Sequence, residues 1–113
     1  MVNQRELIDR FGDREFLCTL WRKAEKELPS RLEEMVPLVN SSSPDWPVLA
    51  TKLHKLRGLV ANFLCSGNAV STLVQCETCV ENSDLQGLQE GWSDFTPQLQ
   101  TEVQELNEWL NCP

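Results

Sequence analysis

Apolar residues recur every three or four positions along almost the whole chain, which is the spacing of one face of an α-helix. Runs that alternate apolar and polar residues, as half-buried strands do, are nearly absent. We therefore predict an all-α protein. The one linker-like stretch is residues 40–44, an Asn followed by three Ser and a Pro.

Turn and cap residues mark the first two helices. The first is predicted over about residues 2–11, because Gly12 and Asp13 supply a stop and then a cap. The second is predicted over about residues 13–39, where Pro29 is expected to kink the helix rather than split it and Pro37 to loosen its last turn. Its apolar stripe comprises Phe16, Leu17, Leu20, Trp21, Ala24, Leu28, Leu32, Met35, Val36 and Val39.

Three further helices complete the pattern. Ser43 or Asp45 is expected to cap the third helix, which runs to about Cys65. Asn68 is expected to cap a fourth, with Val70, Leu73, Val74 and Val80 on its apolar side. The fifth carries the stripe Leu88, Trp92, Phe95, Leu99, Val103, Leu106, Trp109 and Leu110, and its start stays open because Gly91 and Pro97 interrupt it.

These helices predict one domain over residues 1–113, an antiparallel four-helix bundle with a short N-terminal capping helix. The 113 residues carry 10 basic and 17 acidic side chains, a net charge of -7, which opposes nonspecific binding to nucleic acid or anionic membrane. No apolar run approaches the roughly 20 residues of a membrane helix, and the first residues lack a signal-peptide pattern. We expect a cytoplasmic protein without direct membrane contact.

Five cysteines, an odd number scattered among apolar residues, suit reduced thiols better than a disulfide framework. No structural disulfide is therefore expected. Cys76 and Cys79 form a C-x-x-C pair, which can indicate zinc or redox chemistry. No second pair accompanies them, so packing within a helix is favoured and no metal site is expected.

The single histidine, His54, offers a candidate site. At about 100° per residue, Leu49, Leu53, Leu56, Val60, Phe63 and Leu64 define the buried face of the third helix, and His54 projects toward solvent. Ala50, Gly58 and Ala61 leave a shallow surface around the imidazole. A glycine inside a helix costs about 1 kcal/mol relative to alanine, which close approach by another protein would explain.

A neutral imidazole is a competent nucleophile near neutral pH, so His54 is suited to accept a phosphoryl group from a partner. Arg57 and Lys55 would offset the added negative charge. Leu59 is a candidate apolar contact for that partner. No Ser/His/Asp arrangement or phosphate-binding glycine loop is visible, so phosphorylation from ATP is not expected.

The run His54-Lys55-Leu56-Arg57-Gly58 resembles the H-x-L-K-G motif of histidine-containing phosphotransfer domains, with Arg57 in the usual lysine position. Asn62 follows the glycine as an Asn does in that family. The resemblance extends over most of the chain and is greatest to the C-terminal module of tripartite hybrid sensor kinases. One departure is that Leu64, Cys65 and Ser66 separate Phe63 from the next glycine.

The resemblance implies a phosphorelay intermediate in two-component signalling, in which His54 takes phosphate from a receiver-domain aspartate and passes it to another. The expected partners are response-regulator receiver domains, with a covalently linked sensor kinase on the cytoplasmic side of the inner membrane as a further possibility. No cofactor is expected in this chain, since Mg²⁺ belongs to the receiver, and the protein is expected to be a monomer. Ala50, Gly58, Leu59, Ala61 and Asn62 are the expected docking residues.

Two other readings stay open. One is a noncatalytic helical adaptor or inhibitor that binds a receiver or kinase through the same face without carrying phosphate. The other is a thiol or zinc protein that uses Cys76 and Cys79. Replacement of His54 by Gln would abolish phosphotransfer and spare an adaptor.

Overall fold

The computed structural model describes residues 3–65 and 67–111, and its regular structure over these ranges is entirely helical. The helices are α1 (Gln4–Phe11), α2 (Arg14–Val39), α3 (Trp46–Leu64), α4 (Asn68–Glu81) and α5 (Leu85–Leu110). The predicted all-α class is confirmed. None of the described helices is long and apolar enough to cross a bilayer.

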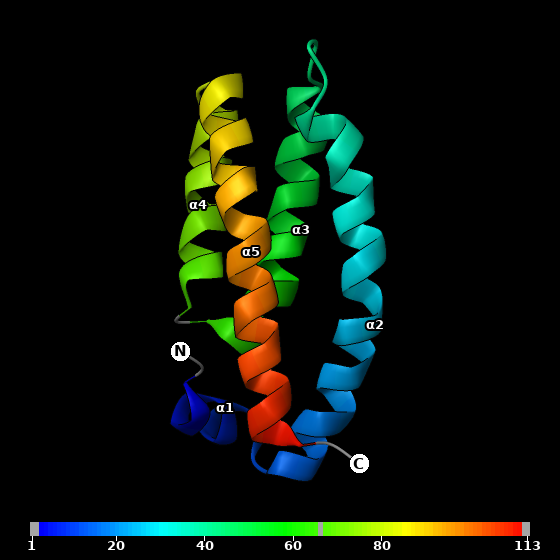
Figure 1. The fold of residues 1–113 in the computed structure, drawn as a ribbon, viewed down its shortest axis with the longest axis vertical. Coiled ribbons are helices and arrows are strands. Elements are labelled where there is room, and N and C mark those ends of the chain that lie inside the picture. Colours follow the sequence, from blue (N-terminus) through cyan, green and yellow to red (C-terminus); the bar gives the residue numbers. More distant parts are fainter. Residues whose placement is uncertain (1–2, 66, 112–113) are drawn as a thin grey trace.

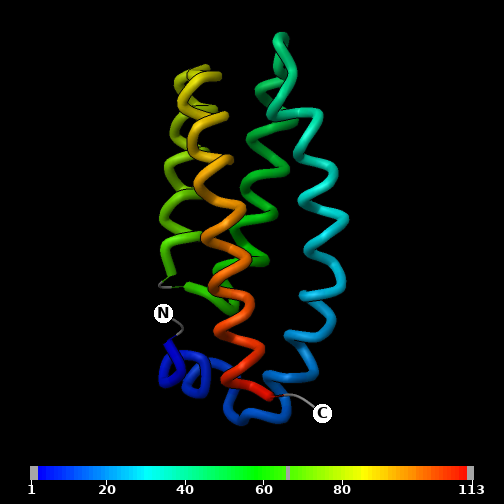
Figure 2. Tube along the Cα trace, viewed as in Figure 1, coloured from blue at the N-terminus to red at the C-terminus, as the bar shows by residue number. Residues whose placement is uncertain are grey.

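The four longer helices lie side by side along the long axis of a molecule that measures 44 × 22 × 20 Å, and α1 lies across one end (Figure 1). Successive long helices run in opposite directions (Figure 2). Helix α4 packs against α3 and α5, α2 packs against α3 and α5, and α1 packs against α2. Helix α3, which carries His54, therefore has α2 on one side and α4 on the other.

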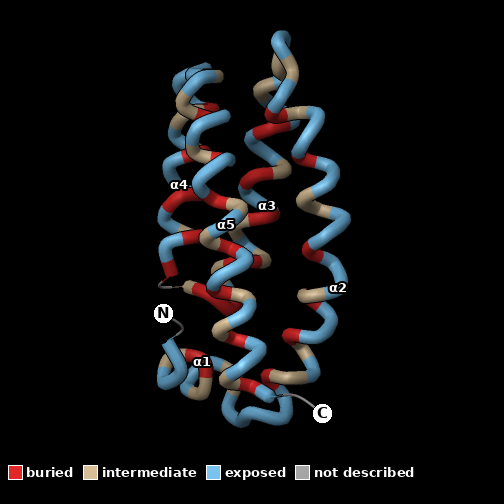
Figure 3. Tube along the Cα trace, in the orientation of Figure 1, coloured by how far each residue is buried: buried red, intermediate tan, exposed pale blue. Residues whose placement is uncertain are grey.

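Buried positions follow the inner sides of the helices (Figure 3). Near the α1 end, the ring of Phe63 stacks on Phe11 at 5.4 Å between centroids and meets Trp21 at 5.1 Å. The indole Nε1 of the buried Trp21 donates to Oδ1 of Asn107 at 2.7 Å, so the polar end of the indole is satisfied. The apolar face predicted for α3 is buried at all six positions: Leu49, Leu53, Leu56, Val60, Phe63 and Leu64.

The predicted apolar stripes include residues that are not buried in the structure. Phe16 and Val36 in α2 are 50% and 46% exposed, and Val74 in α4 is 44% exposed, so assigning them to the buried stripes was wrong. Phe16 and Val36 lie about 100° to either side of the line through the buried Leu17 and Met35, where a straight helix points away from its neighbours. An apolar residue at helical spacing is therefore not always a core residue.

Prolines and glycines do not break the long helices. Helix α2 continues through Pro29 and Pro37, as predicted, and α5 continues through Gly91 and Pro97. The start of α5 at Leu85, which the sequence left open, is set by Asp84, whose side chain accepts a hydrogen bond from the backbone N–H of Gly87 at 2.9 Å.

Asparagine and aspartate side chains cap four of the helices. Asn3, Asp13 and Asp45 cap α1, α2 and α3, and Asp84 caps α5. Helix α4 differs, because Gly67 occupies its N-cap position and has no side chain to donate or accept a hydrogen bond. Asn68, expected as that cap, is instead the first helical residue.

Glu102 of α5 supplies the missing cap of α4. It is 4% exposed, and its Oε2 accepts a hydrogen bond from the backbone N–H of Ala69 at 3.1 Å. The absence of a side chain at Gly67 makes room for this carboxylate, because a Cβ there would collide with Glu102 Oε1. A cap that comes from another helix leaves no local signal in the sequence.

The cysteines differ from expectation in one respect. Cys18 in α2 is disulfide-bonded, whereas Cys65, Cys76 and Cys79 are free thiols. The expectation of no structural disulfide is therefore wrong, because an odd count and scattered positions do not reveal which cysteines the fold brings together. Cys112 lies outside the described residues.

Candidate functional site

His54 lies in the middle of α3, and its side chain is 70% exposed. The neighbouring core residues Leu53 and Leu56 are 0% and 1% exposed, so the helix turns the imidazole away from the core. The prediction that His54 faces solvent is confirmed. The ring is held at the surface by the side chains described next.

Two charged side chains meet the imidazole at its Nδ1 atom. Arg57, one turn along α3, places Nη2 3.2 Å from Nδ1. Glu77 of α4 places Oε2 4.0 Å from the same atom. The two residues also bind each other, with Nε of Arg57 2.5 Å from Oε1 of Glu77.

The Arg57–Glu77 pair is partly desolvated, because the side chains are only 34% and 21% exposed. An ion pair in such a site is screened less by water and salt than one on the open surface. Arg57 is therefore not an uncommitted cation beside His54, as the sequence suggested, since Glu77 already offsets its charge.

Both of these contacts involve Nδ1, and neither involves the other ring nitrogen, Nε2. An arginine nitrogen can only donate, so in its contact with Arg57 the Nδ1 atom accepts and a neutral ring carries its proton on Nε2. If the ring proton moves to Nδ1, Glu77 Oε2 is the nearby acceptor, and Nε2 then carries the free lone pair on a side chain that is 70% exposed. The tautomer that exposes a nucleophilic Nε2 is the one that Glu77 favours.

Glu77 was missed in the sequence. It lies 20 residues after Arg57, on a different helix, and it reads locally as one more acidic residue of a solvated face. Only the pairing of α3 with α4 brings it to the histidine.

Small residues surround the imidazole on the outer face of α3. Ala50 and Gly58 are exposed, and Ala61 is partly exposed. A Cβ built on Gly58 meets nothing within 4 Å, so no neighbour inside the molecule requires a glycine there. Packing inside the molecule therefore does not explain why a glycine occupies this helical position.

The structure does not bring all predicted site residues together. Lys55 faces α2, where it lines a pocket with Arg31 and Lys52, whereas Arg57 faces α4. Leu59 is half-buried and packs against the core. Asn62 is exposed, and its backbone oxygen accepts a hydrogen bond from Nη1 of Arg10 in α1 at 3.3 Å.

The C-x-x-C pair lies against the glycines of α5. A Cβ on Gly91 would lie 2.8 Å from Cys76 Sγ, and one on Gly87 would lie 2.9 Å from Cys79 Sγ. Burial raises the pKa of the Cys76 thiol to about 11, so it is protonated at neutral pH and a poor nucleophile. These contacts favour packing as the role of the pair. Among the described residues no three His, Cys, Asp or Glu side chains are grouped as metal ligands.

In comparisons with known proteins, no family model, no curated protein and no solved structure matches this chain.

Proposed function

We propose that this protein is a histidine phosphocarrier of the phosphotransfer-domain type, with α2 to α5 forming its antiparallel four-helix bundle. The observation that carries the proposal is an imidazole that is 70% exposed and has a carboxylate, Glu77 Oε2, 4.0 Å from Nδ1, where it can accept the ring proton that attack through Nε2 requires. The resemblance of residues 54–58 to the phosphotransfer motif supports the same assignment. The carrier would act in a cytoplasmic phosphorelay.

The proposed reaction forms one bond and breaks one at each step. The Nε2 lone pair of His54 attacks the phosphorus of a receiver's aspartyl phosphate, the N–P bond forms, and the P–O bond to the aspartate breaks, which releases the carboxylate. In the second step an aspartate oxygen of another receiver attacks the same phosphorus and the N–P bond breaks. The receiver supplies Mg²⁺, so this chain needs no cofactor of its own.

Glu77 is proposed as a positioning residue for His54. Attack through Nε2 requires the ring proton on Nδ1, and an Nδ1–H group needs an acceptor there. Glu77 Oε2 is 4.0 Å away, so a small approach of the two side chains completes that hydrogen bond. Arg57 would then leave Nδ1 while it remains bound to Glu77 Oε1.

Ala50, Gly58 and Ala61 give a receiver domain access to His54. A receiver must bring its aspartate within bonding distance of Nε2, which requires close approach to the surface of α3. Replacement of Gly58 by Gln would place a long side chain on this surface and slow transfer. Because nothing lies within 4 Å of the Gly58 Cβ position, the same substitution would leave the fold intact.

The second candidate is an adaptor or inhibitor that docks a receiver or kinase on this face without chemistry. The exposed surface around Gly58 suits docking equally well, so the two functions separate only at His54. An adaptor would tolerate replacement of His54 by Gln, whose side chain is also polar.

The experiment is phosphoryl transfer from receiver domains preloaded with radioactive phosphate. Acid-labile label on the wild type and none on His54→Gln supports the carrier. Complex formation by both proteins, with no label on either from several receivers, supports the adaptor and contradicts the carrier.

A further inference from the structure

A second polar site lies between α2 and α3, on the side of α3 away from Arg57 and Glu77. It is a pocket of about 170 Å³, lined by Arg31, Glu34, Met35, Lys52, Lys55 and Leu56. Lys55 is about 100° around the helix from His54, and Lys52 is further still. The pocket is therefore separate from the imidazole surface.

The lining is strongly basic for an acidic protein. It holds three of the 10 basic residues of a chain whose net charge is -7, and only one carboxylate, Glu34. Like charges collected in one concave site repel one another, and an anion bound between them would relieve that repulsion. The charge of the pocket is opposite to that of the molecule.

The cations of the pocket are incompletely neutralised within the chain. Lys52 Nζ lies 3.1 Å from Glu34 Oε2, but both side chains are well exposed, at 39% and 57%, so this pair is weak. Lys55 forms no ion pair or hydrogen bond with any described residue. An anion could therefore bind Lys55 without breaking an existing contact.

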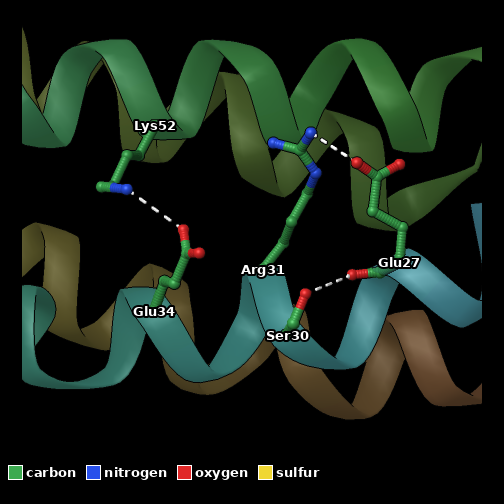
Figure 4. Close-up of polar contacts among 5 residues, drawn as sticks. All are labelled: Glu27, Ser30, Arg31, Glu34 and Lys52. Carbon is green, nitrogen blue, oxygen red and sulfur yellow. Dashed lines mark hydrogen bonds and ion pairs between the residues drawn. The ribbon is translucent and has the colours of Figure 1, made fainter.

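Arg31 is also only partly satisfied. Its Nη2 is 2.7 Å from Oε1 of Glu27, one turn earlier in α2, whereas its Nε is buried and has no hydrogen-bond partner. Figure 4 shows the Arg31 side chain crossing from α2 toward α3, with Glu27 on one side and Glu34 and Lys52 on the other. A buried donor without a partner destabilises the protein, and an acceptor brought beside the guanidinium would recover part of that cost after a small rotation.

The apolar part of the lining favours ionic contacts. Met35 and Leu56 are each 1% exposed, so one side of the pocket is dry core. Charges next to such a wall interact more strongly than charges fully surrounded by water. Three basic groups and an apolar wall around a pocket of about 170 Å³ together match a small, compact anion better than an extended one.

We propose that this pocket is a binding site for a phosphate group, held by Arg31, Lys52 and Lys55. The lining carries two more positive than negative charges, or one more if the Glu27 partner of Arg31 is included. Phosphate, which carries between one and two negative charges near neutral pH, matches that excess. The site involves neither His54 nor Glu77, so it does not depend on the phosphocarrier function.

The test is a titration of the full chain with inorganic phosphate and, separately, with a simple phosphomonoester, at constant ionic strength set with chloride. Binding is read from NMR shifts of the Lys and Arg side chains. We expect saturable shifts at Arg31, Lys52 and Lys55. Tighter binding of inorganic phosphate assigns the free ion as the ligand, and tighter binding of the ester assigns the phosphate of a larger molecule.

Matched variants keep the test specific. Lys55→Gln should weaken binding about tenfold, the loss of roughly 1.4 kcal/mol expected for one charge-assisted contact. Lys23→Gln, which removes the same charge from an exposed position of α2, should leave binding unchanged, and so should His54→Gln. Equal affinities of Lys55→Gln and wild type, shifts that never saturate, or loss of binding in His54→Gln would each overturn the proposal.

Discussion

Arg57 of α3 and Glu77 of α4 form an ion pair with 2.5 Å between Nε and Oε1, and both side chains reach Nδ1 of His54. The pair joins two helices at the position of the only histidine in the chain. Both contacts of the imidazole with these side chains are at Nδ1. The motif residue Arg57 therefore acts on His54 together with a partner that the motif does not include.

Replacement of Glu77 by Gln is expected to slow phosphoryl transfer to His54 about tenfold, equivalent to about 1.4 kcal/mol in the barrier. An amide accepts a hydrogen bond more weakly than a carboxylate, so the tautomer with the proton on Nδ1 is less favoured. The initial rate of label transfer at saturating receiver measures this effect. Receiver affinity should be unchanged.

Glu81→Gln is the matched control, because Glu81 is an exposed residue on the same helix with the same charge. If Glu77→Gln and Glu81→Gln transfer phosphate at equal rates, the positioning role of Glu77 is wrong. A pH profile separates the effect from a general charge effect, since a tautomer preference alters the rate at a pH where the ring is neutral.

Gly58→Ala should stabilise the protein and leave its fold unchanged. The added methyl group meets nothing within 4 Å, and alanine is favoured over glycine inside a helix by about 1 kcal/mol. The melting temperature, measured by calorimetry, should rise by about 4 °C. A lower melting temperature would show that the Gly58 position is crowded.

Gly91→Ala should destabilise the protein, in contrast to Gly58→Ala. The new Cβ would lie 2.8 Å from Cys76 Sγ, closer than packed atoms tolerate, and overpacking costs about 1–3 kcal/mol. The better helix propensity of alanine offsets about 1 kcal/mol of that cost. Urea denaturation should therefore show a net loss of about 1 kcal/mol.

Cys76→Ala removes the sulfur that the new methyl group would strike. In the Cys76→Ala, Gly91→Ala double variant the two changes should compensate, with a coupling energy of at least about 0.5 kcal/mol. Strictly additive effects would contradict the contact between Cys76 and Gly91. The same result would also weaken the packing role assigned to the C-x-x-C pair.

The contribution of Glu102 to the stability of the protein should fall as pH rises, which is the reverse of the usual effect of a carboxylate. Burial raises the pKa of Glu102 in the folded state above the ordinary value of 4.5. Between the ordinary pKa and the raised pKa, the folded state holds more protons than the unfolded state. The contribution of Glu102 to the free energy of unfolding therefore falls as pH rises. The loss is complete once the pH exceeds the raised pKa of Glu102.

Glu102→Gln should therefore be at least as stable as the wild type at pH 7, with an advantage that shrinks as pH falls toward 4.5. Gln still offers an oxygen to the backbone N–H of Ala69, so the cap of α4 persists. Glu108→Gln, an exposed change of the same charge in α5, is the control. Equal pH dependence of both variants in urea denaturation would show that Glu102 is not responsible.

Much of the fold was predictable because it is encoded locally. Helical spacing and caps lie within a few residues of the structure they specify, so the sequence predicted the cap Asp13 and indicated Asp45 as one of two candidates for the next cap. The cap of α4 was not predictable, since Glu102 lies 33 residues from the backbone N–H of Ala69. The exposure of Phe16 was missed because helical spacing does not fix how wide the contact with neighbouring helices is.

The candidate site likewise has some features that the sequence predicted and others that it did not. The orientation of His54 and the open surface at Gly58 follow from the angular positions of residues along one helix, so the sequence predicted them. Glu77 and the separation of Lys55 from Arg57 depend on which helices flank α3, which periodicity does not specify. Contacts between helices are where the structure adds most to the site.

The central claim is that His54 carries a phosphoryl group on Nε2. Because the chain has one histidine, protein labelled with ¹⁵N in histidine gives a single pair of ring-nitrogen resonances. These should be recorded by NMR before and after incubation with a phosphorylated receiver. We predict that the Nε2 resonance acquires coupling to phosphorus while Nδ1 remains protonated; phosphate transfer that leaves both ring nitrogens unmodified, or a bond at Nδ1, would contradict the account.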